Sequence, residues 1–353
     1  MRRPFLVLTI AVVLLARAPV RADDLVLRLF GDYLDALRIQ AGIPGVSAAI
    51  VGDNDIIWER AFGQQDVARS ITTRSDTPFQ FDGLTQVFTA AMVLRCVEEG
   101  RLSLENRVGQ FKPNSPDANA TLREVLTHTS GPSDNLVFAY RPERLAPLTI
   151  AVRQCTGDSF RETLANLFER LAMSNSVPGA DVIHIAPPAE GIPSPAAVDR
   201  YTSVLGRLAT PYAVDKQGHP SPSQYAATTI TPASGLISTT RDFAKFDVAL
   251  KKDGILVRAG TLAAAWQPPI GRNGQALPHG IGWFVQTYNG ETIVWQFGVS
   301  GNASSSLVVT VPGRGVTLIV LANGDGLVRS LPLSAGDLTI SPVGRLFLGT
   351  FIR

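Results

Sequence analysis

Apolar and polar positions follow patterns along the chain that separate helices from strands. In residues 24–40, Leu, Phe and Tyr recur at helical spacing between charged residues, which predicts an amphipathic helix. The stretch GVSAAIVGDNDIIWERAFG predicts two strands around a turn at residues 52–55. Residues 84–99 are apolar on almost every side and are followed by Gly100, so we predict a central, buried helix that ends there.

The rest of the chain predicts a helix-rich middle followed by strands. Residues 174–223 are rich in Pro, Ser and Gly, and we expect them to form a long surface excursion. Two strand–turn–strand pairs are expected further on, joined at residues 289–290 and 312–315. The remaining expected helices are 121–128, 145–156, 159–173, 238–252 and 342–352.

This order of elements predicts an α/β (α+β) fold in which an antiparallel sheet is flanked by the N- and C-terminal helices. A helical lobe would be inserted between the two halves of the sheet. The α/β lobe would comprise residues 23–82 and 225–353, and the helical lobe residues 83–224. An active or binding site is expected in the cleft between the lobes.

Residues 1–22 have the pattern of a secretory signal peptide. Two arginines precede a short apolar run, and small residues lead up to Ala22, after which we expect cleavage. We therefore expect a secreted or periplasmic protein with no membrane span after signal removal; an uncleaved anchor is the alternative. Loss of the four leader arginines changes the formal net charge from +2 to −2, and no basic cluster remains that would bind nucleic acid.

The cysteines and histidines give no pattern of a metal or cofactor site. The four histidines are scattered and no CxxC is present, so we expect no metal and no cofactor. Cys96 and Cys155 both lie in apolar helical stretches. An oxidising compartment would permit a disulfide between them, but we favour two separately buried thiols.

Five segments, in order along nearly the whole chain after the leader, carry a resemblance to a known family. In this order and spacing they resemble the serine β-lactamase and penicillin-binding-protein superfamily, in its class C β-lactamase, D-aminopeptidase and esterase-like branch. The resemblance implies the fold described above and a site of the serine-hydrolase type. The segments are GIPGVSAAIVGDNDIIWERAFGQQDV, VFTAAMVLRCVEEGRLSLENRVGQF, TLREVLTHTSG, TPASGLISTTRDFAKF and SSLVVTVPGRGVTLIVLAN.

The resemblance implies a Ser-x-x-Lys pair at the start of the central helix, where the amine takes the proton of the serine hydroxyl. In this chain the two positions hold Gly83 and Gln86. Glycine has no side chain to acylate, and an amide is no base at neutral pH. None of the five lysines has a serine three residues before it, so the pair does not occur elsewhere in another register.

Two further elements implied by the resemblance are also altered. The Tyr-x-Asn loop matches Tyr140 and Pro142, and Arg141 between them either supplies positive charge or lies at the surface. The strand triplet Lys/His-Thr/Ser-Gly matches WQFG, with Trp295 in place of the cation, or Gln296 or Phe297 if the register slips. A backbone N–H would still be available at the glycine. The expected ligand-binding cleft comprises Gly83, Gln86, Tyr140, Arg141, Trp295, Gln296, Phe297 and Gly298.

Two other polar residues have both a structural and a functional interpretation. His128, in THTSG, could pair with Ser130, but the segment resembles a structural turn of the family, so we expect a buried or turn histidine. Asp82 could act as a general base, but an aspartate at this position more often caps the helix that follows.

Three functional hypotheses follow from these residues. The favoured one is a catalytically silent protein that binds a peptide-like or cell-wall-derived small molecule in the cleft. The second is a hydrolase (esterase, β-lactamase or peptidase type) with rearranged chemistry, in which Tyr140 or Thr85 attacks or Asp82 activates a water. The third is a structural or assembly protein whose cleft is filled by Trp295 and Phe297. The sequence predicts no oligomeric state.

Overall fold

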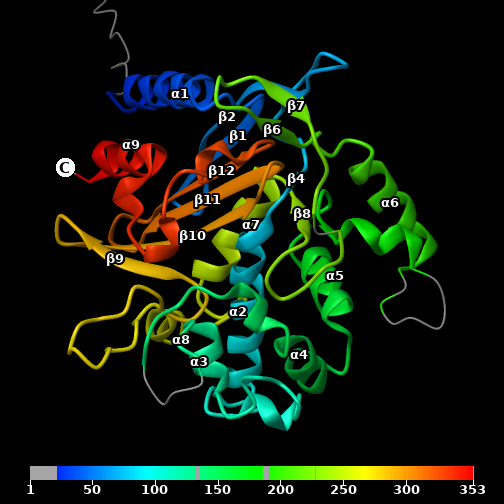
Figure 1. The fold of residues 1–353 in the computed structure, drawn as a ribbon, viewed down its shortest axis with the longest axis vertical. Coiled ribbons are helices and arrows are strands. Elements are labelled where there is room, and N and C mark those ends of the chain that lie inside the picture. Colours follow the sequence, from blue (N-terminus) through cyan, green and yellow to red (C-terminus); the bar gives the residue numbers. More distant parts are fainter. Residues whose placement is uncertain (1–21, 132–135, 186–190, 192, 227, 353) are drawn as a thin grey trace, which may run out of the picture.

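The computed structural model describes residues 22–131, 136–185, 191, 193–226 and 228–352 (Figure 1). The expected signal peptide lies outside this part of the chain except for Ala22, where the first helix begins. No helix in the described ranges is long and apolar enough to cross a membrane.

Among the described residues, a seven-stranded antiparallel sheet forms the centre of the molecule (Figure 1). Its strand order is β3-β2-β1-β12-β11-β10-β9, so that β1 near the start of the chain pairs with β12 near its end. The predicted hairpins at residues 52–55, 289–290 and 312–315 are confirmed. The strand bounds are Gly45–Gly52 (β1), Asp55–Asp66 (β2), Ile71–Thr72 (β3), Phe284–Tyr288 (β9), Glu291–Ser300 (β10), Ser304–Val311 (β11) and Val316–Ala322 (β12).

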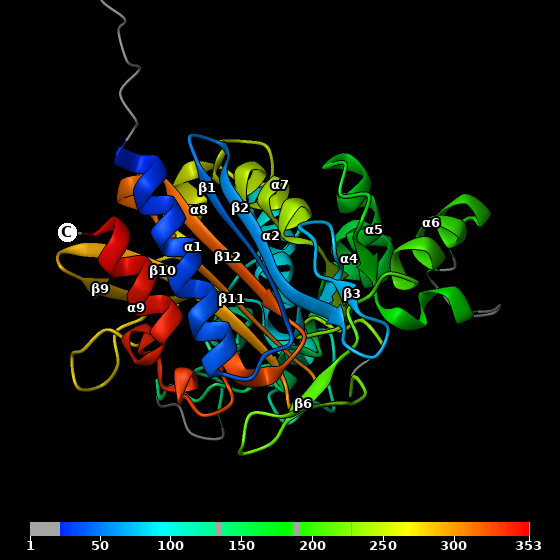
Figure 2. The ribbon, with the colours of Figure 1, turned by 90° about the horizontal axis from the view of Figure 1, so that it is seen from above.

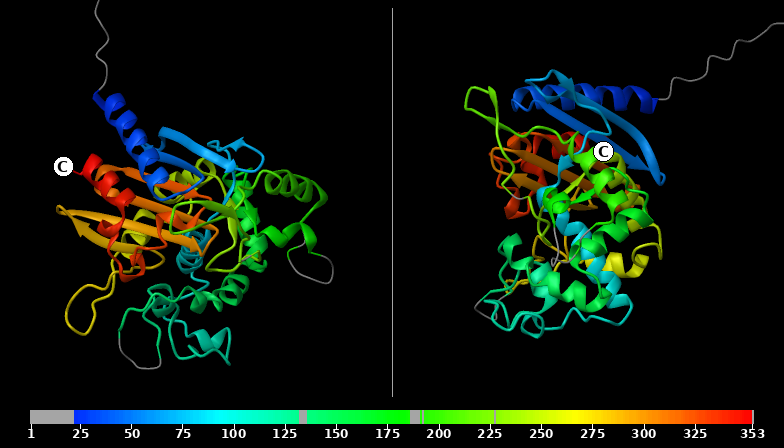
Figure 3. Two further views of the ribbon diagram at one scale, coloured as in Figure 1. Left: turned by 45° about the horizontal axis from the view of Figure 1, so that its top comes forward. Right: turned by 90° about the vertical axis from the view of Figure 1, so that its right-hand side faces the viewer.

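Helices cover both faces of this sheet. On one face lie α1 (Ala22–Gln40) and α9 (Pro342–Phe351), and on the other lie α2 (Thr85–Glu98) and α7 (Thr240–Lys251) (Figures 1 and 2). The fold class predicted from the sequence is therefore confirmed. Figure 3 shows the helices of the middle third gathered away from α1 and α9. They are α3 (Leu122–Leu126), α4 (Leu148–Thr156), α5 (Phe160–Arg170) and α6 (Pro195–Leu205), with α8 (Ala259–Ala265) following α7.

Alternation along β10 decides which of its side chains face the N-terminal end of α2. Trp295 and Phe297 belong to the apolar cluster under α1 and α9, whereas Val294 belongs to the cluster around α2. Because successive side chains of a strand point to opposite faces, Gln296 and Gly298 lie on the same face as Val294.

The central helix α2 is buried on all sides along most of its length, as its composition predicts. Every residue from Thr85 to Leu94 is buried. Phe88 stacks on Phe246 of α7 with ring centroids 3.9 Å apart. A helix enclosed in this way is held by its neighbours over its whole surface, so the residues at its N-terminus have fixed positions.

Residues 174–223 contain α6, a helix that the sequence analysis did not predict. The Ser194 hydroxyl accepts a hydrogen bond from the Ala197 N–H, and Pro195 stands at the first helical position. Tyr201 and Val204 then bury their side chains against the rest of the molecule. The Pro- and Ser-rich composition predicted a surface excursion and gave no sign of a helix, but here a serine and a proline begin one.

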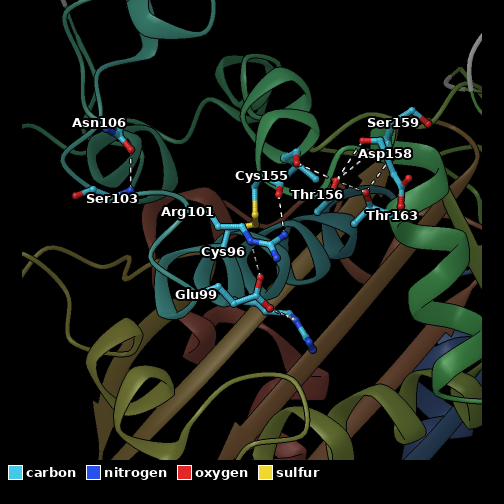
Figure 4. Close-up of a disulfide and its surroundings, with 12 residues drawn as sticks. Cys96, Glu99, Arg101, Ser103, Asn106, Cys155, Thr156, Asp158, Ser159 and Thr163 are labelled. Carbon is cyan, nitrogen blue, oxygen red and sulfur yellow. Dashed lines mark hydrogen bonds and ion pairs between the residues drawn. A yellow bond between two sulfur atoms is a disulfide. The ribbon is translucent and has the colours of Figure 1, made fainter.

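Cys96 of α2 and Cys155 of α4 form a disulfide (Figure 4). The expectation of two separate thiols is therefore wrong. The two helices pack side by side, which brings the Cα atoms to within 6.1 Å of each other. Arg101 adds a hydrogen bond of 3.0 Å from its guanidinium to the Cys155 carbonyl.

Replacement of both cysteines by alanine is expected to lower the free energy of unfolding by about 3 kcal/mol, because the bridge closes a long loop in the unfolded chain. The two cysteines are 59 residues apart in the sequence. Urea denaturation of the wild type and the double alanine variant measures the difference. Adding reductant should lower the stability of the wild type alone; equal loss in both proteins would contradict a stabilising bridge.

Candidate functional site

The site begins where the short strand β4 (Phe79–Gln80) runs into a 3-10 turn at Asp82–Leu84 and then into α2. Gly83 lies in this turn, directly against β10. A Cβ placed on Gly83 would overlap the carbonyl oxygen of Phe297 and lie 3.2 Å from the Cα of Gly298. A Cβ on Gly298 would overlap the carbonyl oxygen of Phe81 and lie 2.7 Å from the nitrogen of Gly83. The two backbones therefore approach as closely as a pair of glycines allows.

One turn further along α2, Gln86 joins two other side chains in a buried hydrogen-bond network. Its Nε2 donates to the Tyr140 hydroxyl at 2.7 Å, and its Oε1 accepts from Nε2 of His128 at 3.0 Å. Burial raises the pKa of Tyr140 well above its usual range, so the phenol stays protonated at neutral pH. The network contains no group that carries a charge at neutral pH.

His128 holds the loop that carries Tyr140 in place. Its carbonyl accepts a hydrogen bond from the Ala139 N–H, and its Nδ1 accepts one from the Arg141 N–H. Nδ1 therefore acts as the acceptor and Nε2 carries the proton given to Gln86. Burial lowers the pKa of His128 to about 3, so the ring is neutral. No hydrogen bond to Ser130 is found within the described part of the chain, and the ring lies in a buried turn.

On β10, Gln296 rather than Trp295 faces α2. Its Nε2 donates to the Gly282 carbonyl at 3.2 Å and to Nε2 of His279 at 3.4 Å. Its Oε1 accepts from the Phe297 N–H. Burial lowers the pKa of His279, so this pair is also neutral. The placement of Trp295 in the cleft was wrong because its ring points to the opposite face of the sheet.

Asp82 is buried beside Gly83 and does not cap a helix. Its carboxylate accepts hydrogen bonds from Gln80 at 3.0 Å and from the Ser304 hydroxyl at 2.6 Å. Neither the turn nor α2 has a side-chain cap, so the capping interpretation is wrong. Burial raises the pKa of Asp82 from 3.8 to about 7. A carboxyl group that is half ionised near neutral pH is chemically able to exchange a proton with a ligand or water.

A cavity of about 610 Å3 opens next to these residues. The side chains of Trp295 and Phe297 do not fill this space, contrary to the third hypothesis. Of these two residues, only Phe297 is among the described lining residues. Of the residues expected from the sequence, Gly83, Tyr140 and Phe297 line it, whereas Gln86, Arg141, Trp295, Gln296 and Gly298 do not. The described lining residues are Asp82, Gly83, Tyr140, Pro142, Glu143, Ala146, Ala226, Thr231, Ala233, Ser234, Phe297, Val299, Ser300 and Gly301.

A model of the Beta-lactamase family matches residues 28–335 of this sequence. The chain belongs to the Beta-lactamase family. It is 26% identical over 341 residues to penicillin-binding protein 4 of Amycolatopsis lactamdurans, which covers 83% of this chain and 84% of that protein. The resemblance inferred from the five segments is therefore confirmed.

Two solved structures related to the Beta-lactamase family fold superpose well on this chain. The octameric penicillin-binding protein homologue from Pyrococcus abyssi gives a TM-score of 0.71 at 20% identity, covering 91% of this chain and 77% of that one. D-alanine carboxypeptidase AmpC from Burkholderia cenocepacia gives 0.69 at 17% identity, covering 93% and 99%. At these identities the likeness concerns the fold.

Two serines line the cavity of this Beta-lactamase family member and were not assigned to the site from the sequence. They are Ser234 and Ser300. Ser234 is within 3.3 Å of the Thr231 hydroxyl, and in the described residues neither serine is hydrogen-bonded to a Lys, His or Asp side chain. A serine without such a base is a weak nucleophile. Neither of the segments that contain them, TPASG and GVSGN, has a lysine three residues after the serine. The sequence therefore gave no signal that would mark these serines as nucleophiles.

Proposed function

We propose that this protein is an extracytoplasmic, catalytically silent member of the Beta-lactamase family that binds a peptide-like or cell-wall-derived small molecule in the cavity beside Gly83. The observation that carries the proposal is the close contact between the backbone of β10 and Gly83. This contact leaves no room for a side chain with a nucleophile at position 83. The neutral Gln86 network behind it supplies no base. Loss of the nucleophile alone costs such an active site several orders of magnitude in rate.

Two observations support the location and the ligand. A disulfide is stable in oxidising compartments, and the pattern of residues 1–22 is that of a secretory leader. The open cavity with a mixed apolar and hydroxyl-bearing lining has the size of small-molecule sites.

We further propose that the cavity lies between two lobes. One lobe would comprise residues 23–82 and 225–353, and the other residues 83–224.

Labelling of the full chain with a fluorescent penicillin and with a fluorophosphonate tests the silent site. We expect no covalent adduct after denaturing electrophoresis, while an active penicillin-binding protein treated in parallel is labelled. A stoichiometric adduct on this chain would refute the proposal.

A second candidate function rests on Asp82. Its raised pKa and its place in the cavity wall suit a general base that activates a water, which would make the protein a hydrolase. Thr85 is a poorer candidate, because its hydroxyl is fully buried and accepts a hydrogen bond from the Leu236 N–H. Turnover of a p-nitrophenyl ester that is lost in Asp82→Asn would favour this candidate. Turnover that persists in Asp82→Asn, Tyr140→Phe and Thr85→Ala would dispose of it.

A further inference from the structure

We infer that a second cavity, at the far end of the sheet from Gly83, binds the ring of a neutral sugar. This cavity and the one beside Gly83 lie at opposite ends of β11, so the inference does not depend on the proposed function. Three features of the second cavity carry it: a lysine whose charge is already paired, the carbon surface of an indole ring, and two polar turn residues.

The second cavity has a volume of about 380 Å3 and lies where two hairpin turns meet the helix pair α7 and α8 (Figure 2). The turn between β1 and β2 contributes Asp53 and Asn54, and the turn between β11 and β12 contributes Pro312. Lys251 ends α7, and Trp266 directly follows α8. The volume is in the range of small-molecule sites, so a sugar ring has room here.

Lys251 gives this cavity a hydrogen-bond donor whose positive charge is already balanced. Its Nζ lies 2.5 Å from the Asp247 carboxylate and donates to the Thr317 hydroxyl at 3.0 Å. Both of these partners are buried, whereas the lysine side chain is 18% exposed. An ammonium group has three N–H donors, and the described part of the chain offers no third acceptor. A ligand hydroxyl can accept the remaining bond, which is strengthened by the charge of the donor.

Trp266 gives the cavity an apolar wall of fixed orientation. The residue is half-buried, and its indole nitrogen is among the fully buried atoms, so its ring presents carbon atoms to the cavity. Trp283 packs edge-on against it, with ring centroids 6.3 Å apart and an interplanar angle of 85°. The face of an aromatic ring is electron-rich and attracts the C–H groups on one side of a sugar ring.

Asp53 and Asn54 give the rim of the cavity polar groups of both kinds. Both residues are exposed in a tight turn with φ values of 51° and 63°, and no side-chain hydrogen bond of Asp53 or Asn54 is found within the described ranges. The carboxylate accepts hydrogen bonds, and the amide both donates and accepts. A sugar hydroxyl also does both, so one sugar ring can bond to Lys251 and to the turn at the same time.

The charges around the cavity favour a neutral ligand over a charged one. An anion would meet a lysine already paired with Asp247 and would be repelled by Asp53. A cation would find only the exposed Asp53 carboxylate, and exposed ion pairs contribute little. A zwitterion such as leucine would pair with both charges, but each of its own charges would lose hydration for a weak partner.

Saturation-transfer NMR with the full chain tests this selectivity at pH 7. The neutral probes are the methyl glycosides of glucose, galactose and N-acetylglucosamine, and the charged probes are leucine, benzoate and benzylamine. We expect the best glycoside to bind with a Kd of about 1 mM and every charged probe to bind at least about tenfold more weakly. A charged probe that binds as tightly as the best glycoside would overturn the inference, and so would the absence of binding by all three glycosides.

Variants assign the binding to this cavity. Trp266→Leu should weaken the best glycoside at least about tenfold, and Trp266→Phe should restore most of the affinity because it keeps an aromatic face. Trp58→Leu is the matched control, because this half-buried tryptophan packs on Phe30 under α1 and should leave the affinity unchanged.

Asp53→Gly keeps the result decisive if Trp266→Leu does not fold. Glycine accepts the left-handed backbone of this exposed turn, so the variant should fold and should bind the glycoside at least about threefold more weakly. An affinity unchanged in Asp53→Gly and in every folded Trp266 variant would overturn the assignment of the sugar to this cavity.

Discussion

The double substitution Gly83→Ser with Gln86→Lys is expected to leave the protein unlabelled by fluorescent penicillin. It is also expected to lower the free energy of unfolding by about 5 kcal/mol. The substitution would restore the residue types that the family resemblance implies, yet the surroundings of both positions have no room for them.

Gly83→Ser and Gln86→Lys are each expected to destabilise the protein, for different reasons. A Cβ on Gly83 overlaps the Phe297 carbonyl oxygen, which belongs to the backbone of β10 and is held by the pairing of that strand with β11. Overpacking of this kind costs about 1–3 kcal/mol. A lysine at position 86 would place an ammonium among Tyr140 and neutral His128, where no carboxylate contacts it. Breaking a buried network with an unpaired charge costs about 3–5 kcal/mol.

Chemical denaturation and labelling of the single and double variants separate the two causes. Gly349→Ser is a matched control, because this glycine lies on the exposed side of α9 and a Cβ there meets nothing within 4 Å. The control should keep wild-type stability or gain slightly. A double variant that is as stable as the wild type and forms an adduct would show that β10 can withdraw from Gly83.

Asp82→Asn is expected to stabilise the protein at alkaline pH and to leave its stability nearly unchanged near pH 4. Burial raises the pKa of Asp82 from 3.8 to about 7. The folded state therefore holds this proton more tightly than the unfolded state. The resulting stability is fully present below pH 3.8 and is lost as the pH rises through 7. A shift of this size corresponds to about 4 kcal/mol.

Asparagine keeps the shape of the aspartate without its charge, and it tolerates the left-handed backbone at this position, where φ is 49°. Urea denaturation of both proteins at pH 4.5 and pH 8.5 gives the difference directly. Titrations of other groups, including the buried histidines, occur in both proteins and cancel in the comparison. Asp32→Asn, at an exposed site, should show no pH-dependent gain. A gain for Asp82→Asn that is the same at both pH values would contradict the raised pKa.

The fold could be predicted from the sequence because its elements are marked by local patterns. The spacing of apolar residues predicted the buried central helix and the terminal amphipathic helices, and turn residues predicted the hairpins. The structure has each of these elements at the predicted place. Helix α6 was missed because its Ser-Pro start has the same composition as a loop. The disulfide was missed because it depends on the packing of α2 against α4, which no local pattern records.

The site could be predicted only in part. Gly83, Gln86 and Tyr140 were found because the spacing implied by the family resemblance marks them, and the structure brings them together. Trp295 was misplaced because the face of a strand depends on its register, and a slip of one residue exchanges Trp295 for Gln296. The partners of Asp82 and Gln86 come from distant segments, at Ser304 and His128, so only the folded chain reveals them.

The contact between the two glycine backbones also bears on how such a protein can change over time. A serine at position 83 would add the hydroxyl by the change of a single residue. The carbonyl of Phe297 occupies that space, however, and Gly298 is held just as tightly from the other side. Strand β10 would have to move before a serine at position 83 could be tolerated, so changes elsewhere in the chain would have to precede that substitution.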